Sequence, residues 1–123
     1  MRNPISKHRL SAFRRQRGRC YYCGLPMWLR GLTAGLEAKL ADKRRPARLQ
    51  CTAEHLIARQ DGGSDSARNI VAACRFCNST RHKLASPLEP EQFRLHVTRR
   101  IRAGKWHPRQ LLELLESRKE RER

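Results

Sequence analysis

Two short cysteine pairs constrain the fold of this chain more than any other feature of its sequence. Cys20 and Cys23 form one C-x-x-C pair, and Cys74 and Cys77 form another, with residues 24–73 between the pairs. A C-x-x-C turn points both thiolates at one ion, so two such pairs supply the four soft ligands of a closed tetrahedral zinc site. The sequence therefore predicts a fold in which two distant segments meet around one structural Zn²⁺.

Disulfides, redox-active cysteine pairs and an iron–sulfur cluster are the other uses of such spacing. Residues 1–17 lack the apolar core of a signal peptide, and no run of the sequence approaches the length of a membrane span. We therefore expect a soluble, cytoplasmic protein with no membrane partner, and in that reducing compartment paired cysteines favour zinc over disulfides. The fifth cysteine, Cys51, is expected to be a small buried residue without a ligand role.

The charge of the chain points to an anionic partner. The 123 residues include 28 Lys and Arg against 11 Asp and Glu, which gives a net charge of +17. Such a field repels itself in a compact state unless a polyanion screens it, so a nucleic acid, either DNA or RNA, is the expected partner. A solubilising basic surface or a ribosome-like structural protein is the competing explanation. Only 38% of the residues are apolar, so the core of one domain, residues 1–123, is expected to need the metal as a staple.

In the first half of the chain, sequence patterns predict a helix before the first cysteine pair and another after it. Residues 6–16 are typical of a short basic amphipathic helix, with Ser6 as its N-cap and Gly18 at its end. Residues 25–29 have the character of the start of a strand. Residues 31–42 carry a leucine at every fourth position, which predicts a further helix.

The second half predicts a hairpin followed by helices. A strand is predicted over residues 48–57 and a loop over 59–68. A second strand follows over residues 70–73, and a helix over residues 74–84. The Ser86-Pro87 step stops that helix, because the residue before a proline is disfavoured in helical conformation. Beyond it, apolar residues at four-residue spacing predict two more helices, separated by Gly104 and a turn at Trp106.

Five polar residues point to a second metal site. Asn78 and His82 are spaced i, i+4 and share one face of the predicted helix, while Glu54 supplies a carboxylate from the first strand. One anionic and two neutral ligands suit a divalent ion that keeps water for a substrate phosphate. His55 is the candidate general base that activates water, provided that a bend of the strand brings it near the ion. Asn69 is expected to fix the loop that orients His55.

Together these residues resemble the HNH endonucleases, in their zinc-stapled form with a ββα-metal, treble-clef-like core. The similarity is carried by CYYCG, by EH followed by a GG-containing loop, by NIVAACRFCN and by the final HK, and it spans residues 20–84. It implies an α+β fold in which a small zinc-stapled core, a β-hairpin plus a helix, is flanked by additional helices. Residues 31–47 are then an insertion, and residues 87–123 are a basic helical extension at the C-terminus.

The resemblance also implies roles for single residues. His55 matches the general base of the family, Asn69 matches the motif asparagine, and Asn78 matches its final position. His82 matches a site where many members place a further metal-binding histidine. Glu54 stands where aspartate is commoner, which lengthens the ligand arm. The catalytic ion is expected to be Mg²⁺ or another divalent ion such as Mn²⁺ or Ni²⁺.

The leading hypothesis is therefore a metal-dependent DNA endonuclease that hydrolyses phosphodiester bonds, by nicking or by double-strand cleavage, as a monomer or a homodimer. A non-catalytic zinc-finger protein that binds nucleic acid is the alternative, and an assembly module is a third. Retention of the polar set around His55 favours the enzyme, because a binding module needs only the cysteines. The basic residues expected to contact the nucleic-acid backbone are Arg59, Arg75, Arg81, Lys83, Arg99 and Arg100.

Overall fold

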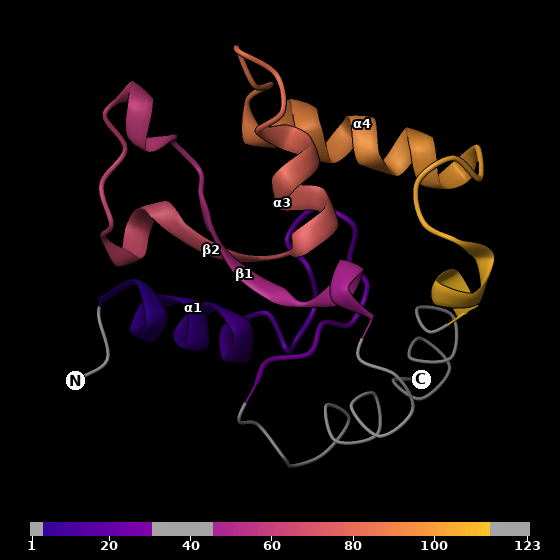
Figure 1. Cartoon of the computed structure of the whole chain (residues 1–123), viewed down its shortest axis with the longest axis horizontal. Coiled ribbons are helices and arrows are strands. Elements are labelled where there is room, and N and C mark those ends of the chain that lie inside the picture. The colour runs from indigo at the N-terminus through magenta and orange to yellow at the C-terminus, as the bar shows by residue number, and fades with distance from the viewer. Residues whose placement is uncertain (1–3, 31–45, 114–123) are drawn as a thin grey trace.

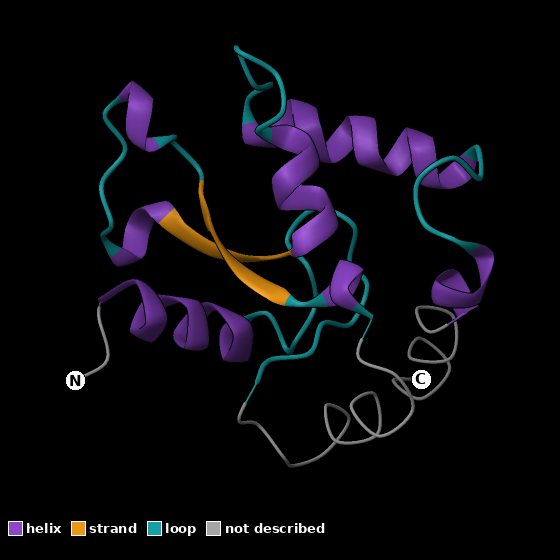
Figure 2. Cartoon of the chain, viewed as in Figure 1, coloured by secondary structure: helices purple, strands orange, loops and turns teal. Residues whose placement is uncertain are grey.

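A small β-hairpin lies at the centre of the molecule, with helices on both sides of it (Figures 1 and 2). The structure is a computed structural model, and it describes residues 4–30 and 46–113. The helix predicted over residues 31–42 and the end of the chain beyond residue 113 lie outside the described residues.

The hairpin consists of β1 (Cys51–His55) and β2 (Ile70–Cys74), which pair antiparallel with Cys51 opposite Cys74 and His55 opposite Ile70. β1 is shorter than the predicted strand because residues Ala47–Leu49 form a 3₁₀ helix. The connecting loop also contains two short 3₁₀ helices, Arg59–Asp61 and Ala67–Asn69. Every residue of β2 is buried, which fits a strand covered on both faces.

Helix α3 (Arg75–Arg81) follows β2 without a loop, so the hairpin and the helix form one ββα unit. Cys74 caps the helix, since its Sγ accepts a hydrogen bond from the backbone N–H of Cys77. The combination of helices with a two-stranded antiparallel sheet confirms the predicted α+β class and the small ββα core.

Helix α1 (Pro4–Arg15) packs against both strands of the hairpin. It begins before the predicted start, so Ser6 lies within the helix and the N-cap prediction is wrong. Pro4 fits the first turn because the N–H that proline lacks has no partner inside a helix there. At the other end Arg17 has a φ of 56°, and the N–H of Gly18 donates to the carbonyl of Phe13. This is a Schellman ending in which arginine takes the left-handed position.

The segment between α1 and the first 3₁₀ helix carries the first cysteine pair. Cys20 to Cys23 form a tight turn that closes with Gly24, whose φ of 76° favours glycine and whose N–H donates to the Cys20 carbonyl. The strand expected over residues 25–29 is reduced to isolated pairings of Arg19 with Pro26 and of Trp28 with Gln50.

Helix α4 (Pro90–Arg102) lies beyond α3 (Figure 1) and joins the same core. Its Phe93 and Val97 are buried together with Phe13, Leu25 and Leu49 of the earlier segments. Gly104, with a φ of 70°, follows the end of the helix as predicted. The turn after it buries Trp106 and His107. The C-terminal extension therefore contributes to the core that surrounds the cysteines.

Candidate metal centre and active site

The four paired cysteines meet in the core of the molecule. The Sγ atoms of Cys20, Cys23, Cys74 and Cys77 all lie within 4.8 Å of one another, and all four residues are buried. Zn–S bonds of about 2.3 Å in a tetrahedron place the sulfur atoms roughly 3.8 Å apart, and Cys23 and Cys74 are 3.9 Å apart. Cys51 is buried but is not a member of the cluster, as expected.

Several N–H groups point at these sulfur atoms. The backbone N–H of Cys74 and that of Tyr22 donate to Cys20 Sγ over 3.3 Å and 3.4 Å. The indole N–H of Trp106 donates to Cys77 Sγ over 3.3 Å. Such donors stabilise thiolate ligands and fix their orientation. Trp106 was assigned only to a turn by its sequence context, so this contact was missed.

Burial makes the ionisation of the Cys23 and Cys77 thiols depend on a cation. Burial raises the pKa of the Cys23 thiol and that of Cys77 well above the ordinary value, because a thiolate is poorly solvated there. A bound divalent metal ion supplies the charge that lets such thiols ionise. The buried tetrahedral arrangement therefore fits the predicted structural zinc ion.

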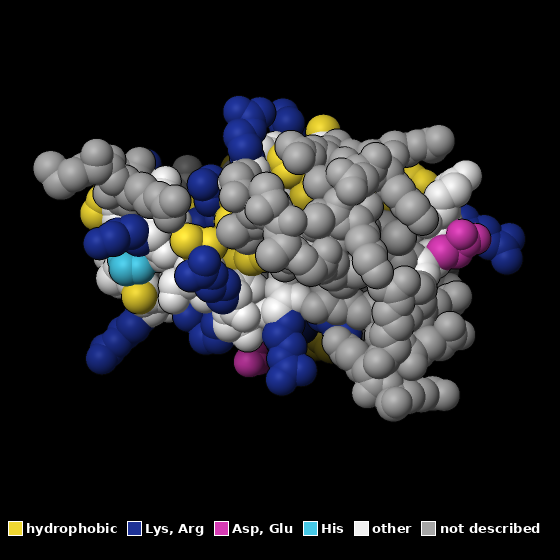
Figure 3. All heavy atoms as spheres, turned by 90° about the horizontal axis from the view of Figure 1, so that it is seen from below, with side chains coloured by type: hydrophobic (Ala, Val, Ile, Leu, Met, Phe, Trp, Pro, Cys, Tyr) yellow, Lys and Arg dark blue, Asp and Glu magenta, His cyan; other side chains and the backbone are white. Residues whose placement is uncertain are grey.

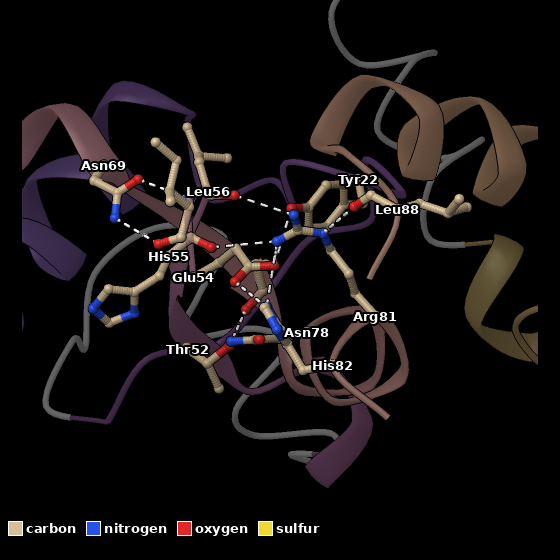
Figure 4. A network of polar contacts seen from close by, with 12 residues as sticks. Tyr22, Thr52, Glu54, His55, Leu56, Asn69, Asn78, Arg81, His82 and Leu88 are labelled. Atoms are coloured by element: carbon tan, nitrogen blue, oxygen red, sulfur yellow. Dashed lines mark hydrogen bonds and ion pairs between the residues drawn. The ribbon is translucent and has the colours of Figure 1, made fainter. Parts of the chain in front are cut away.

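A second polar cluster surrounds Glu54, whose side chain is only 1% exposed (Figure 4). Its Oε1 is 2.8 Å from His82 Nε2. Its Oε2 accepts hydrogen bonds from the hydroxyl of Tyr22 over 3.0 Å and from Arg81 Nη1 over 3.2 Å. Burial and then the charge of Glu54 raise the pKa of Tyr22, so its hydroxyl remains a donor. The two carboxylate oxygens thus have separate sets of partners.

Arg81 is buried and makes several of the hydrogen bonds in this cluster. Its side chain is 5% exposed, and besides Glu54 it donates to the carbonyls of His55, Leu56 and Leu88. This corrects the expectation that Arg81 contacts nucleic acid, because its guanidinium is occupied inside the protein. A sequence signal existed: residue 81 follows Cys77 by four positions, so both lie on the buried face of the helix.

Asn78 is held against the first strand. Its Nδ2 donates to Thr52 Oγ1 over 3.0 Å and to the Ala53 carbonyl over 3.2 Å. Asn78 therefore lies next to Glu54 on β1 (Figure 4). His82 directly follows α3, and both members of the predicted i, i+4 pair line the same pocket as Glu54.

Asn69 organises the loop after β1. Its Nδ2 donates to the carbonyls of Ile57 and Ser64 over 2.9 Å and 2.8 Å, and its Oδ1 accepts from the Ile57 N–H over 2.8 Å. Its own carbonyl accepts from the N–H of Leu56. These contacts connect both sides of the loop that begins directly after His55.

His55 has a carboxylate partner of its own. Its Nε2 lies 2.8 Å from Asp65 Oδ1, and Arg59 Nε donates to the same oxygen over 3.2 Å. The hydrogen bond with His55, followed by the charge of Arg59, lowers the pKa of Asp65 below its ordinary value. The His55 ring lies apart from Asn78 and His82 in Figure 4, as the alternation of a strand requires. Asp65 was not selected from the sequence, where it is one of several polar loop residues.

An open pocket of about 410 Å³ unites the predicted residues. Glu54, His55, Asn78 and His82 all line it, and Arg59 stands at the same wall. Asn69 is not among the residues that line the pocket, and its side chain bonds within the loop described above. The pocket therefore brings a carboxylate, a carboxamide and two imidazoles to one solvent-accessible place.

The remaining basic residues predicted to touch nucleic acid are on the surface. Arg59, Arg75, Lys83 and Arg99 are exposed, and Arg100 is partly exposed. Lys and Arg side chains project at several points of the described part of the face shown in Figure 3. Of the described helices, none is long and apolar enough to cross a membrane.

Comparison with known protein families gives one match, which covers the segment that carries the pocket residues. Residues 40–84 match the HNH endonuclease family. This HNH segment contains β1, the Asn69 loop, β2 and α3, with the polar residues of the pocket and the second cysteine pair. The family points to nuclease-type activity and a nucleic-acid substrate. Comparisons with curated proteins and with solved structures found no match.

Proposed function

We propose that this protein is a metal-dependent HNH endonuclease that hydrolyses phosphodiester bonds in DNA. The observation that carries the proposal is the single pocket lined by Glu54, His55, Asn78 and His82 within the HNH segment. A zinc-stapled module that only binds nucleic acid has no use for this set at one open site. The net charge of +17 supports a polyanionic substrate.

Glu54, Asn78 and His82 would hold the divalent ion. Glu54 Oε1 and His82 Nε2 lie 2.8 Å apart. Because the Asn78 Nδ2 donates to β1, the carboxamide oxygen of Asn78 would be the ligand atom. Oxygen and imidazole ligands of this kind suit Mg²⁺ or Mn²⁺ with open positions for water and phosphate. When bound, the ion neutralises charge on the phosphate and on the leaving oxygen.

His55 acts as the general base. It accepts a proton from the attacking water, and the Asp65 carboxylate at 2.8 Å stabilises the imidazolium that results. Asn69 holds the loop through its three side-chain hydrogen bonds, so His55 and Asp65 keep their relative positions. Exposed Arg59 at the pocket wall and Lys83 nearby in sequence position the DNA backbone without reading its sequence.

The test is incubation of the purified protein with supercoiled plasmid and Mg²⁺, Mn²⁺ or Ni²⁺. We expect nicked or linear DNA with at least one ion, and a loss of at least about a hundredfold in rate for His55→Ala, as for removal of a general base. His96→Ala, which changes an exposed histidine of α4, is the matched control and should cut normally. Absence of cleavage with every ion, or equal cleavage by folded His55→Ala, would show that the catalytic assignment is wrong. DNA binding without cleavage would favour the zinc-finger alternative.

A further inference from the structure

Tyr22 makes hydrogen bonds in both polar clusters of the protein. It lies between the zinc ligands Cys20 and Cys23, and its backbone N–H donates to Cys20 Sγ over 3.4 Å. Its hydroxyl donates to Glu54 Oε2 over 3.0 Å. The side chain that reaches the pocket carboxylate thus starts from the turn that holds the structural metal.

The ring of Tyr22 is locked in this position. Tyr22 is 3% exposed, and its ring packs edge to face on Phe93 with a centroid distance of 4.9 Å and an interplanar angle of 88°. It also meets the ring of Tyr21, with a centroid distance of 5.2 Å and an interplanar angle of 85°. A ring fixed by two neighbours places its hydroxyl with little freedom. The hydrogen bond to Glu54 is therefore a rigid link.

The two oxygens of Glu54 differ in their partners. Tyr22 and Arg81 Nη1 both donate to Oε2, while Oε1 faces His82 Nε2. A carboxylate whose one oxygen already accepts two hydrogen bonds offers the other oxygen to a metal ion. Hydrogen bonds to a ligating carboxylate commonly account for a tenfold or larger part of metal affinity.

We propose that Tyr22 is a positioning residue that, with Arg81, restricts Glu54 to one-oxygen coordination through Oε1 and makes the catalytic ion site depend on the folded zinc knuckle. This inference rests on the proposed function, because it takes Glu54 as a ligand of the catalytic ion. The zinc knuckle, residues 20–24, then has a second task beyond holding the fold together. It sets the geometry of the reactive site through a single phenol.

The test compares Tyr22→Phe with Tyr21→Phe in the full-length, zinc-loaded protein. Both variants remove one hydroxyl from the same turn, but the Tyr21 ring packs against Arg94 and Tyr22 and not against Glu54. Zinc content and circular dichroism establish that each variant is folded. Binding of Mn²⁺ is then measured by calorimetry without DNA, and the imidazole ¹⁵N shifts of His82 are recorded by NMR without Mn²⁺.

We expect Tyr22→Phe to keep one zinc per chain, to bind Mn²⁺ about tenfold more weakly and to shift the His82 signals, whereas Tyr21→Phe matches the wild type in all three. The inference is overturned if Tyr22→Phe binds Mn²⁺ and shows His82 shifts like the wild type. It is also overturned if Tyr22→Phe loses its zinc, because the residue would then act on the structural site. If the wild-type protein never cuts plasmid, the proposed function is wrong. The His82 shifts of Tyr22→Phe and wild type would still test whether Tyr22 positions Glu54.

Discussion

The burial of His107 predicts how the stability of this protein depends on pH. His107 is 4% exposed, and its Nδ1 accepts a hydrogen bond from Arg48 Nε over 3.0 Å. Burial, and then the charge of Arg48, lowers the pKa of His107 from 6.5 to about 4. The imidazole is therefore neutral in the folded protein at pH values where the unfolded chain already binds a proton.

Because the unfolded chain binds this proton more readily than the folded protein, the stability of the folded protein falls as the pH falls. Because the folded pKa is the lower one, the contribution of His107 to stability is complete above pH 6.5 and is lost as the pH falls from 6.5 towards 4. Between pH 7.5 and pH 5.5, these two pKa values give a loss of about 1 kcal/mol in the free energy of unfolding. At ordinary urea m-values, this lowers the unfolding midpoint by roughly 0.5–1 M.

The assay is urea unfolding of zinc-saturated protein at pH 7.5 and pH 5.5. The lower limit is kept at 5.5 because protonation of thiolates releases zinc in more acidic solution. His107→Gln retains a neutral acceptor for Arg48 but cannot titrate, so its loss of stability should be smaller than that of the wild type by about 1 kcal/mol. His96→Gln, at an exposed position, should behave as the wild type. Equal pH dependence of His107→Gln and wild type would refute the reasoning.

Three further substitutions test the contacts that hold the two clusters together. Arg81→Met leaves the Glu54 carboxylate without its cation in the interior and should cost about 3–5 kcal/mol, measured by chemical unfolding; an unchanged midpoint would contradict the buried ion pair. Asn69→Ala should cost about 1–3 kcal/mol and accelerate proteolysis of its loop, and a loop as resistant as in the wild type would count against its role. Cys74→Ser should abolish zinc binding in metal analysis while Cys51→Ser keeps one ion per chain, and the opposite pattern would overturn the ligand assignment.

The parts of the fold that sequence patterns predicted are those fixed by local geometry. The spacing within each C-x-x-C pair identifies ligands that must converge, so the zinc cluster followed from the cysteines alone. The apolar run of β2, and the i, i+4 spacing of Asn78 and His82, placed the pocket residues on adjacent elements. The sequence also indicated that the His55 side chain would point away from that of Glu54, since neighbours on a strand point in opposite directions.

What sequence patterns missed depends on tertiary contacts. Arg81 is one arginine in a chain rich in arginine, and only the position of Cys77 on the same helical face distinguishes it from a surface cation. Tyr22 was not selected from the sequence, because nothing local indicates that its hydroxyl reaches a strand residue 32 positions away in the chain. Asp65 meets His55 only after the loop has folded. Each of these side chains forms a hydrogen bond with Glu54 or His55, which were predicted from the sequence. Such contacts between distant residues are specified only by the folded structure.

The core that α4 completes has a consequence for protein engineering. The HNH segment, residues 40–84, contains only Cys74 and Cys77 of the four zinc ligands and neither Tyr22 nor the buried Phe93 and Trp106. Grafting that segment alone into another protein would transfer the side chains of the pocket without Tyr22 and without the core that packs around it. A transplantable cassette has to run from the start of α1 to at least Trp106, so recombination breakpoints chosen at the borders of the family match would cut through the working unit.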